Sequence, residues 1–266
     1  MERLHPRTSW AIRLDFAVAL VDDEERCTRV ANILVRPCFR ELERMSIHRG
    51  DRWLEHGPVT VERMVRILRD RSNKDVTFDT KRNREIVATG EIRNGTYETN
   101  EGATRFNSHL VFPLVPADVG EVTAAICELA DVLDAGAGFV AVEPTYPVAQ
   151  ELALGGFDSK PRPGLSRQRM LERRGRDRHQ GRRQELLSGP EWGTFLGAQH
   201  LEKLDLELVR ASGAFERVVR ISPRLAFLQV TADPEADGRD GFEQLLVDAR
   251  AALAPIMMDL SDVNLE

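Results

Sequence analysis

The chain has 266 residues, 42% of them hydrophobic and 30% charged, and a formal net charge of −6. These values are ordinary for a soluble globular protein, and the length allows one large domain or two small halves without disulfides or metal. No apolar run approaches the roughly 20 residues that cross a bilayer. The N-terminus, MERLHPRTSW, lacks the apolar core of a secretory signal. We therefore expect a cytoplasmic protein.

The charge is unevenly distributed along the chain. The segment Lys160–Arg183, called the basic band below, holds ten Lys/Arg against Glu172 and Asp177, a local charge of +8, which leaves −14 for the rest. An acidic surface repels nucleic acid and membranes, and it attracts basic partners and speeds their encounter.

The N-terminal part predicts a strand followed by two helices. Apolar and polar residues alternate over 10–21, as in a half-buried strand. A helix opens at the acidic run 22–26, which suits the positive end of the helix dipole, and Pro37 is expected to kink or split it. Helical spacing of apolar residues predicts a second helix over 59–70.

The middle of the chain predicts strands separated by turn signals and then a well-marked helix. The expected elements are strands at 75–79, 84–92 and 106–115, a helix at 118–134, a strand at 138–143 and a helix at 146–154. Asp118 and Glu121 have the spacing of a capping box, and Gly136 is expected to end that helix.

The C-terminal part begins after a Gly- and Pro-rich stretch at 155–166, the best boundary in the sequence. Pro190 suits a helix start that places Trp192, Phe195 and Leu196 on one side as a packing element. The elements expected after it are a short helix at 204–212, strands at 214–221 and 224–232, and a last helix opened by Asp240 and Glu243 and closed by Pro255. The acidic tail after Pro255 is expected to fray.

Strand pairs outnumber strand–helix–strand crossovers, which predicts an α+β fold with a mostly antiparallel sheet and helices packed on it. We expect one domain over 1–266, with candidate halves 1–155 and 187–266 joined by the basic segment 156–186.

Catalytic motifs are absent from the sequence. It contains no HExxH, GxSxG, Walker loop or GxGxxG after a strand, and its three cysteines, Cys27, Cys38 and Cys127, form no CxxC pair. Residues 233–244 resemble a calcium loop, but Gln244 stands where a bidentate Glu is required. We expect no catalytic residues, no metal and no cofactor. The alternative is an enzyme, such as a hydrolase, that uses scattered acids with His109 or His200.

The basic band is open to three interpretations. The favoured one is a mobile, solvated segment, because few of its residues are apolar and two glycines weaken a helix. The second is pairing with the acidic remainder of the chain. The third is nucleic-acid binding by an accessory protein, although no aromatic residue lies between Phe157 and Trp192 to stack on bases.

The stretch GPEWGTFLGAQHLEKL, together with FLQVTADPEADGRDGFEQLLVDARAALAPI, resembles the C-terminal half of the type VI secretion immunity family of the TsiV kind. The resemblance is strongest over about 187–256. The positions that match the family pattern are Trp192, Thr194, Phe195, Leu196, Gln229, Pro234, Asp237, Gly238, Leu253 and Pro255.

This resemblance implies a cytoplasmic immunity protein, monomeric or homodimeric, that binds a cognate toxin encoded by an adjacent gene and occludes its active site. Some toxins paired with this family resemble nucleases, whose nucleic-acid grooves are basic. Surface acids are therefore the candidate toxin contacts. We expect the protein to have no membrane partner and no nucleic-acid partner. They are Asp233, Glu235, Asp237, Asp240, Asp259, Asp262 and Glu266.

Overall fold

The computed structural model describes residues 8–16, 20–49, 52–70, 75–82, 85–93, 97–98, 104–154, 165–178, 185–236, 241–261 and 263. Its strands are β1 (Ser9–Phe16), β2 (Arg44–Arg49), β3 (Arg52–Pro58), β4 (Asp75–Arg82), β5 (Glu85–Arg93), β6 (Tyr97–Glu98), β7 (Thr104–Pro113), β8 (Ala135–Glu143), β9 (Gly193–Leu196), β10 (Arg217–Ser222) and β11 (Leu225–Gln229).

The α-helices are α1 (Glu24–Leu34), α2 (Val61–Leu68), α3 (Val119–Val132), α4 (Tyr146–Leu154), α5 (Arg167–Arg178), α6 (Ala198–Leu201), α7 (Leu206–Ala211) and α8 (Phe242–Ala252). Short 3₁₀ turns are η1 (Pro37–Phe39), η2 (Pro116–Asp118), η4 (Pro234–Ala236) and η5 (Ala254–Ile256). Within the described ranges, no helix combines the length and hydropathy that crossing a membrane requires.

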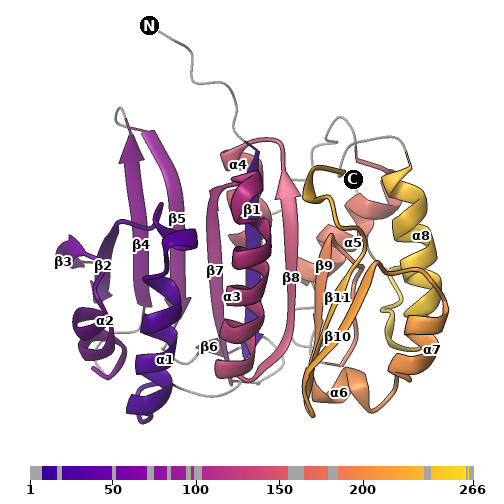
Figure 1. Cartoon of the computed structure of the whole chain (residues 1–266), viewed down its shortest axis with the longest axis horizontal. Helices are drawn as coiled ribbons and strands as arrows, with labels where there is room; N and C mark the ends of the chain where they lie inside the picture. The colour runs from indigo at the N-terminus through magenta and orange to yellow at the C-terminus, as the bar shows by residue number, and fades with distance from the viewer. Residues whose placement is uncertain are drawn as a thin grey trace, which may run out of the picture.

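One antiparallel sheet runs through the whole molecule (Figure 1). Its strands lie in the order β10-β11-β9-β8-β1-β7-β5-β4-β2-β3, and β6 pairs with β7. Every strand pairing in the described part of the chain is antiparallel. The α+β fold class with a mostly antiparallel sheet is therefore confirmed.

The sheet is continuous across the two candidate halves of the chain. Strand β8 of the first half pairs with β9 of the second, with Val140 opposite Gly193. Trp10 of β1 also meets Trp192, with ring centroids 5.4 Å apart in an edge-to-face arrangement. Both halves therefore contribute to the same sheet and the same buried cluster.

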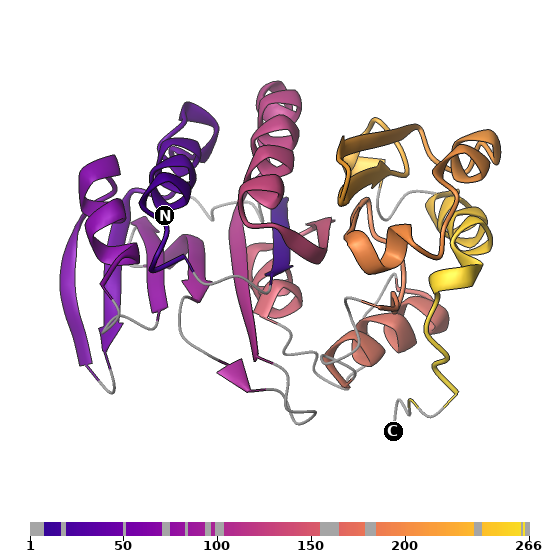
Figure 2. The ribbon, with the colours of Figure 1, turned by 90° about the horizontal axis from the view of Figure 1, so that it is seen from below.

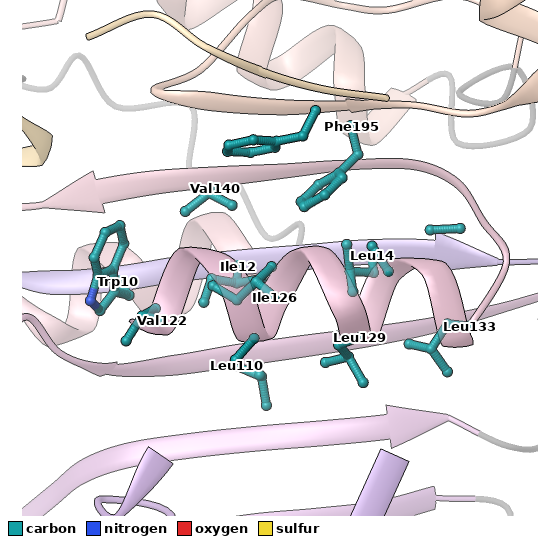
Figure 3. Packing of buried hydrophobic residues seen from close by; sticks show 14 of the residues in the cluster. Trp10, Ile12, Leu14, Leu110, Val122, Ile126, Leu129, Leu133, Val140 and Phe195 are labelled. Atoms are coloured by element: carbon teal, nitrogen blue, oxygen red, sulfur yellow. The ribbon is translucent and has the colours of Figure 1, made fainter. Parts of the chain in front are cut away.

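Helices cover both faces of the sheet (Figures 1 and 2). Helices α1, α2 and α3 lie on one face, and α4 and α5 lie on the other. Helix α3 packs its apolar stripe of Val122, Ile126, Leu129 and Leu133 against the sheet, where Figure 3 shows it beside β1.

Strand β1 lies in the middle of the sheet and is buried on both faces. Trp10, Ile12 and Leu14 belong to the cluster that includes α3, whereas Ala11 packs in the cluster of α4. Arg13 and Asp15 are buried as well. The prediction of a half-buried strand is therefore wrong for the face that carries Arg13 and Asp15. The alternation of apolar and polar residues is the same whether the polar side chains face solvent or lie in a buried charged layer.

Several other sequence predictions need correction. The strand pair β2–β3 was not predicted. Gly136 lies inside β8, and the turn before it is made by Asp134 with a positive φ of 50°. Asp118 makes no side-chain cap on α3. Its Oδ2 instead accepts a hydrogen bond from Nη1 of Arg40 at 2.9 Å.

The segment that follows Trp192 is the strand β9 and not the predicted start of a helix, and the short helix α6 begins only at Ala198. Strand β9 pairs along its two edges with β8 and β11, and all four of its residues are buried, so the sequence there shows no alternation of apolar and polar residues. A Cβ at Gly193 would come within 2.7 Å of the Phe227 ring, and a Cβ at Gly197 within 2.3 Å of the Gly136 carbonyl oxygen. These glycines allow the neighbouring strands to approach closely.

The C-terminal segment packs against the protein, so the prediction that it frays is wrong for its described part. Leu187 N–H donates to the Ile256 carbonyl at 2.7 Å, and Met258 N–H donates to the Leu187 carbonyl at 2.7 Å. Met258 and Val263 are buried. The start of α8 also differs from the prediction, since Gly241 is its N-cap and Asp240 lies outside the described residues.

Candidate functional site

Three of the acids expected to contact a toxin lie in the described part of the chain. Asp233 is partly buried just before η4, and Glu235 is exposed within η4, which follows the last strand. Glu235 N–H donates to Oδ1 of Asp233 at 2.9 Å, so Asp233 also fixes the turn. Asp237 and Asp240, together with Gly238 of the family pattern, lie outside the described residues.

Asp259 is exposed in the C-terminal segment. Its Oδ1 accepts a hydrogen bond from Ser261 N–H at 2.9 Å, and this backbone donor lowers the pKa of the carboxyl. Asp262 and Glu266 lie outside the described residues. The structure therefore places the described candidate acids on two segments, η4 and the tail.

The residues of the family pattern are mostly parts of the core. Trp192, Thr194, Phe195 and Leu196 are all buried in or beside β9. Gln229 ends β11 and donates through Nε2 to the Thr231 carbonyl at 2.9 Å. Pro255 is exposed in η5 at the end of α8. These positions hold the scaffold, and they contribute no reactive group.

The charged feature that sequence reasoning missed lies under α5, in the basic band. Arg169, Arg173 and Arg176 share one face of this helix and are buried. Their guanidinium groups converge on one carboxylate, Glu191, at 3.0, 3.2 and 3.1 Å. Arg173 also donates to Oε1 of Glu143, the last residue of β8, at 2.5 Å. We call these five residues, with Glu172 and Arg250, the α5 cluster.

The remaining members of the cluster connect α5 to α8. Arg250 donates through Nε and Nη2 to the two oxygens of Glu172, the second at 2.8 Å. Gln168 donates to the same carboxylate at 2.9 Å. Gly189 makes room for it, because a Cβ there would lie 2.3 Å from Oε2 of Glu172.

The electrostatics of Glu191 follow from its neighbours. Burial by itself disfavours the carboxylate, but the attraction of Arg173, Arg169 and Arg176 outweighs it and holds the pKa of Glu191 well below its usual range. Arg176 also lies over the ring of Phe139, 4.1 Å from its centroid. The cluster thus pairs four arginines with three carboxylates, a formal charge of +1, and three of the four arginines are buried.

The favoured interpretation of the basic band as a mobile, solvated segment is therefore wrong for the described residues 165–178. Three of its arginines share one helix face because they are spaced by four and three residues, and this face points inward, toward Glu191 and Glu143. The interpretation as intramolecular pairing is correct for these three. They are not accessible to phosphate, which weakens the nucleic-acid alternative. The spacing in the sequence places the three arginines on one face of a helix, but it does not indicate that this face is buried.

The two histidines of the enzyme alternative lie on different elements. His109 of β7 is buried, with Nδ1 3.6 Å from Oε2 of Glu91. Burial, together with Arg13 and Arg93, lowers its pKa to about 3, so it is neutral at pH 7 and a weak base. His200 accepts a hydrogen bond from Gly197 N–H through Nδ1 at 3.3 Å and so caps α6.

Metal ligands do not gather in the described part of the structure. Among those residues, no group of three or more His, Cys, Asp or Glu could hold a metal ion. Cys27, Cys38 and Cys127 are free thiols, and burial raises the pKa of each, to about 11, 11 and 12.

No protein-family model matches this chain. No curated protein sequence matches it either. The fold is similar to that of the Pseudomonas aeruginosa T6SS protein PA0821, with a TM-score of 0.62 and 15% identical residues, over 94% of this chain and 73% of that chain. At this level of identity, the similarity is one of fold.

Proposed function

We propose that this chain is an immunity protein of a type VI secretion system, which binds a cognate toxin in the cytoplasm and covers its active site. The observation that carries the proposal is the fold similarity to a type VI secretion protein over 94% of the chain. The TsiV-like pattern over about 187–256 supports the finer assignment to an immunity role.

The charge distribution supports a basic toxin partner. The net charge is −6, and the buried arginines of α5 are paired with carboxylates inside the fold rather than displayed on the surface. A nuclease toxin has a basic groove for nucleic acid, and exposed carboxylates complement it. We propose Glu235 and Asp259 as contacts, with Asp233 holding the turn that presents Glu235.

The proposal assigns no catalytic role to the chain. The pKa of His109 is lowered to about 3, which makes it a poor general base near neutral pH. Blocking a toxin requires only surface complementarity and slow release, which buried aromatic or apolar anchors on the two partners provide.

The test is co-expression with the product of the adjacent gene, scoring growth and co-purification together. We expect the neighbour alone to arrest growth and this chain to restore growth in a stable complex. If the product of the adjacent gene neither arrests growth nor forms a complex with this chain, the proposal is wrong.

Charge reversals locate the contact surface once a complex is in hand. We expect Glu235→Lys and Asp259→Lys each to weaken binding at low salt. The matched control is Glu62→Lys, which changes another exposed acid, in the first turn of α2. Equal affinity for all three variants would show that the toxin binds elsewhere.

A further inference from the structure

A glycine inside α5 lies where the C-terminal segment crosses this helix (Figure 2). Gly175 is buried, and a Cβ added there would lie 2.4 Å from Cδ2 of Leu260 and 3.5 Å from Cγ2 of Val263. Glycine in the interior of a helix is less stable than alanine, so helix formation does not favour it here. Its missing side chain leaves a notch in the surface of α5, called the Gly175 notch below, and Leu260 fills this notch.

The residues before Leu260 are held by backbone hydrogen bonds to another part of the chain. Leu187 N–H donates to the Ile256 carbonyl, and Met258 N–H donates to the Leu187 carbonyl, each at 2.7 Å. The side chains of Ile256 and Met258 are buried. The C-terminal segment is therefore fixed by its backbone one residue before Asp259 and by the Gly175 notch one residue after it.

Asp259 itself is exposed between these two fixed points. Its Oδ1 accepts a hydrogen bond from Ser261 N–H at 2.9 Å, which holds the local turn. The carboxylate thus faces solvent from a backbone whose path is set by contacts on both sides. A group that is already in place before binding loses little conformational entropy when a partner contacts it.

We infer that the Gly175 notch presents Asp259 as a pre-ordered contact for a basic side chain, an arginine or a lysine, of the partner. Gly175 is a positioning residue, because it acts through Leu260 and is itself covered by that side chain. The partner rests on the proposed function, whereas the order of the C-terminal segment can be measured on the free protein.

The first experiment is amide hydrogen exchange on the free, full-length chain, comparing Gly175→Ala with Gly120→Ala. Both substitutions replace a glycine of an α-helix, but an added Cβ at Gly120 meets nothing within 4 Å. The new methyl group at Gly175 displaces Leu260, so exchange of the Met258 amide should rise about tenfold, against less than about twofold in Gly120→Ala. Equal exchange of this amide in the wild type and in Gly175→Ala would overturn the inference.

A compensating substitution separates the Gly175 notch from a general weakening of α5. Leu260→Val removes the Cδ2 atom that collides with the new methyl group, while Cγ of Leu260 lies at 3.6 Å, an ordinary contact distance. Combined with Gly175→Ala, it should return exchange of the Met258 amide to within about threefold of the wild type. If the double variant exchanges as fast as Gly175→Ala alone, the effect does not arise at the notch and the inference is wrong.

If Gly175→Ala fails to fold, Leu260→Ala replaces it, because this variant empties the notch and leaves the sequence of α5 unchanged. We expect the same direction of change, a rise of about fivefold or more in exchange of the Met258 amide. No rise in this variant would show that the notch does not hold the segment.

The second experiment measures the affinity for the toxin, the product of the adjacent gene. Asp259→Asn should raise Kd about tenfold, and Gly175→Ala should raise Kd about fivefold through the cost of ordering the loosened segment. In an Asp259→Asn background, Gly175→Ala should change Kd less than about twofold, because the segment no longer supplies the contact.

Fully additive effects of these two substitutions on the free energy of binding would contradict the positioning role. A wild-type chain that binds no toxin contradicts the proposed function, and the exchange experiment on the free protein still decides whether the Gly175 notch orders the segment.

Discussion

Glu191 shows how a single buried side chain organises its surroundings. It is 1% exposed and meets three arginines from one helix, which is why its pKa is lowered despite burial. Buried ion pairs add little net stability compared with apolar packing, but removal of one member leaves uncompensated charge in the interior. The cluster therefore specifies how α5 docks more than it stabilises the fold.

We expect Glu191→Gln to lower the free energy of unfolding by about 3–5 kcal/mol, because three buried guanidinium groups lose their shared counter-charge. Denaturant unfolding followed by circular dichroism measures this. The control is Glu185→Gln, an exposed acid in the same segment, which should change little. A Glu191→Gln protein as stable as the control would mean that the cluster relaxes or is hydrated.

His109 gives the protein a specific sensitivity to acid. Its pKa in the folded protein is about 3, against an ordinary value of 6.5, so below pH 6.5 this histidine binds a proton in the unfolded chain but not in the folded protein. Stability is then lost as the pH falls through this window, at up to about 1.4 kcal/mol per pH unit.

We expect His109→Gln to reduce the loss of stability between pH 7.5 and pH 5.0 by about 2 kcal/mol, as that slope implies. Urea unfolding of the wild type and the variant at both pH values isolates this residue from other groups that titrate there. Identical pH slopes in the two proteins would show that His109 is not held neutral.

At the scale of elements, the contact between β8 and β9 depends on close backbone approach. Gly197 N–H donates to the Gly136 carbonyl at 3.2 Å, and a Cβ on Gly197 would meet that same backbone. The φ of Gly197 is −82°, which any residue adopts, so the constraint is space alone.

We expect Gly197→Ala to destabilise the protein by about 2–3 kcal/mol through this backbone clash. The matched control is Gly120→Ala in α3, where an added Cβ meets nothing within 4 Å. That substitution should be neutral or stabilising by up to about 1 kcal/mol, because alanine favours a helix. Thermal unfolding of both variants tests the contrast, and a stable Gly197→Ala would place the two strands farther apart.

At the scale of the whole molecule, one sheet and one buried cluster join both candidate halves. Trp10 and Trp192 come from different halves and are in contact. Replacing Trp53 with Phe leaves Trp10 and Trp192 as the only tryptophans, so that fluorescence reports on the contact between the halves. We expect this fluorescence and far-UV circular dichroism to give the same unfolding midpoint. Two separated midpoints would show that the halves unfold independently.

The charge of the whole molecule predicts the salt dependence of its encounter with a toxin. Opposite net charges speed association at low salt, and screening removes this advantage. We expect the association rate constant to fall about tenfold from roughly 0.05 to 0.5 M salt, with little change in the dissociation rate. Stopped-flow mixing tests this, and a rate indifferent to salt would contradict acidic mimicry.

Local patterns in the sequence predicted many of the elements. Helical spacing identified α2 and α3, and short β-rich runs between turn signals identified β4, β5 and β7, because these signals depend on neighbouring residues alone. Composition and strand pairing patterns were enough for the α+β class. For β9, burial on both faces produces an apolar run that a helix segment also shows.

The α5 cluster was decided only by the tertiary structure. Its ion pairs join residues 30 positions apart, as in Arg173–Glu143, and 78 apart, as in Arg250–Glu172. The spacing of the arginines in the sequence is the same whether their face of the helix lies against water or against the sheet. The arginines point toward the carboxylates that the folded chain brings beneath the helix. Once the helix docks, the cost of desolvating the guanidinium groups makes this pairing necessary.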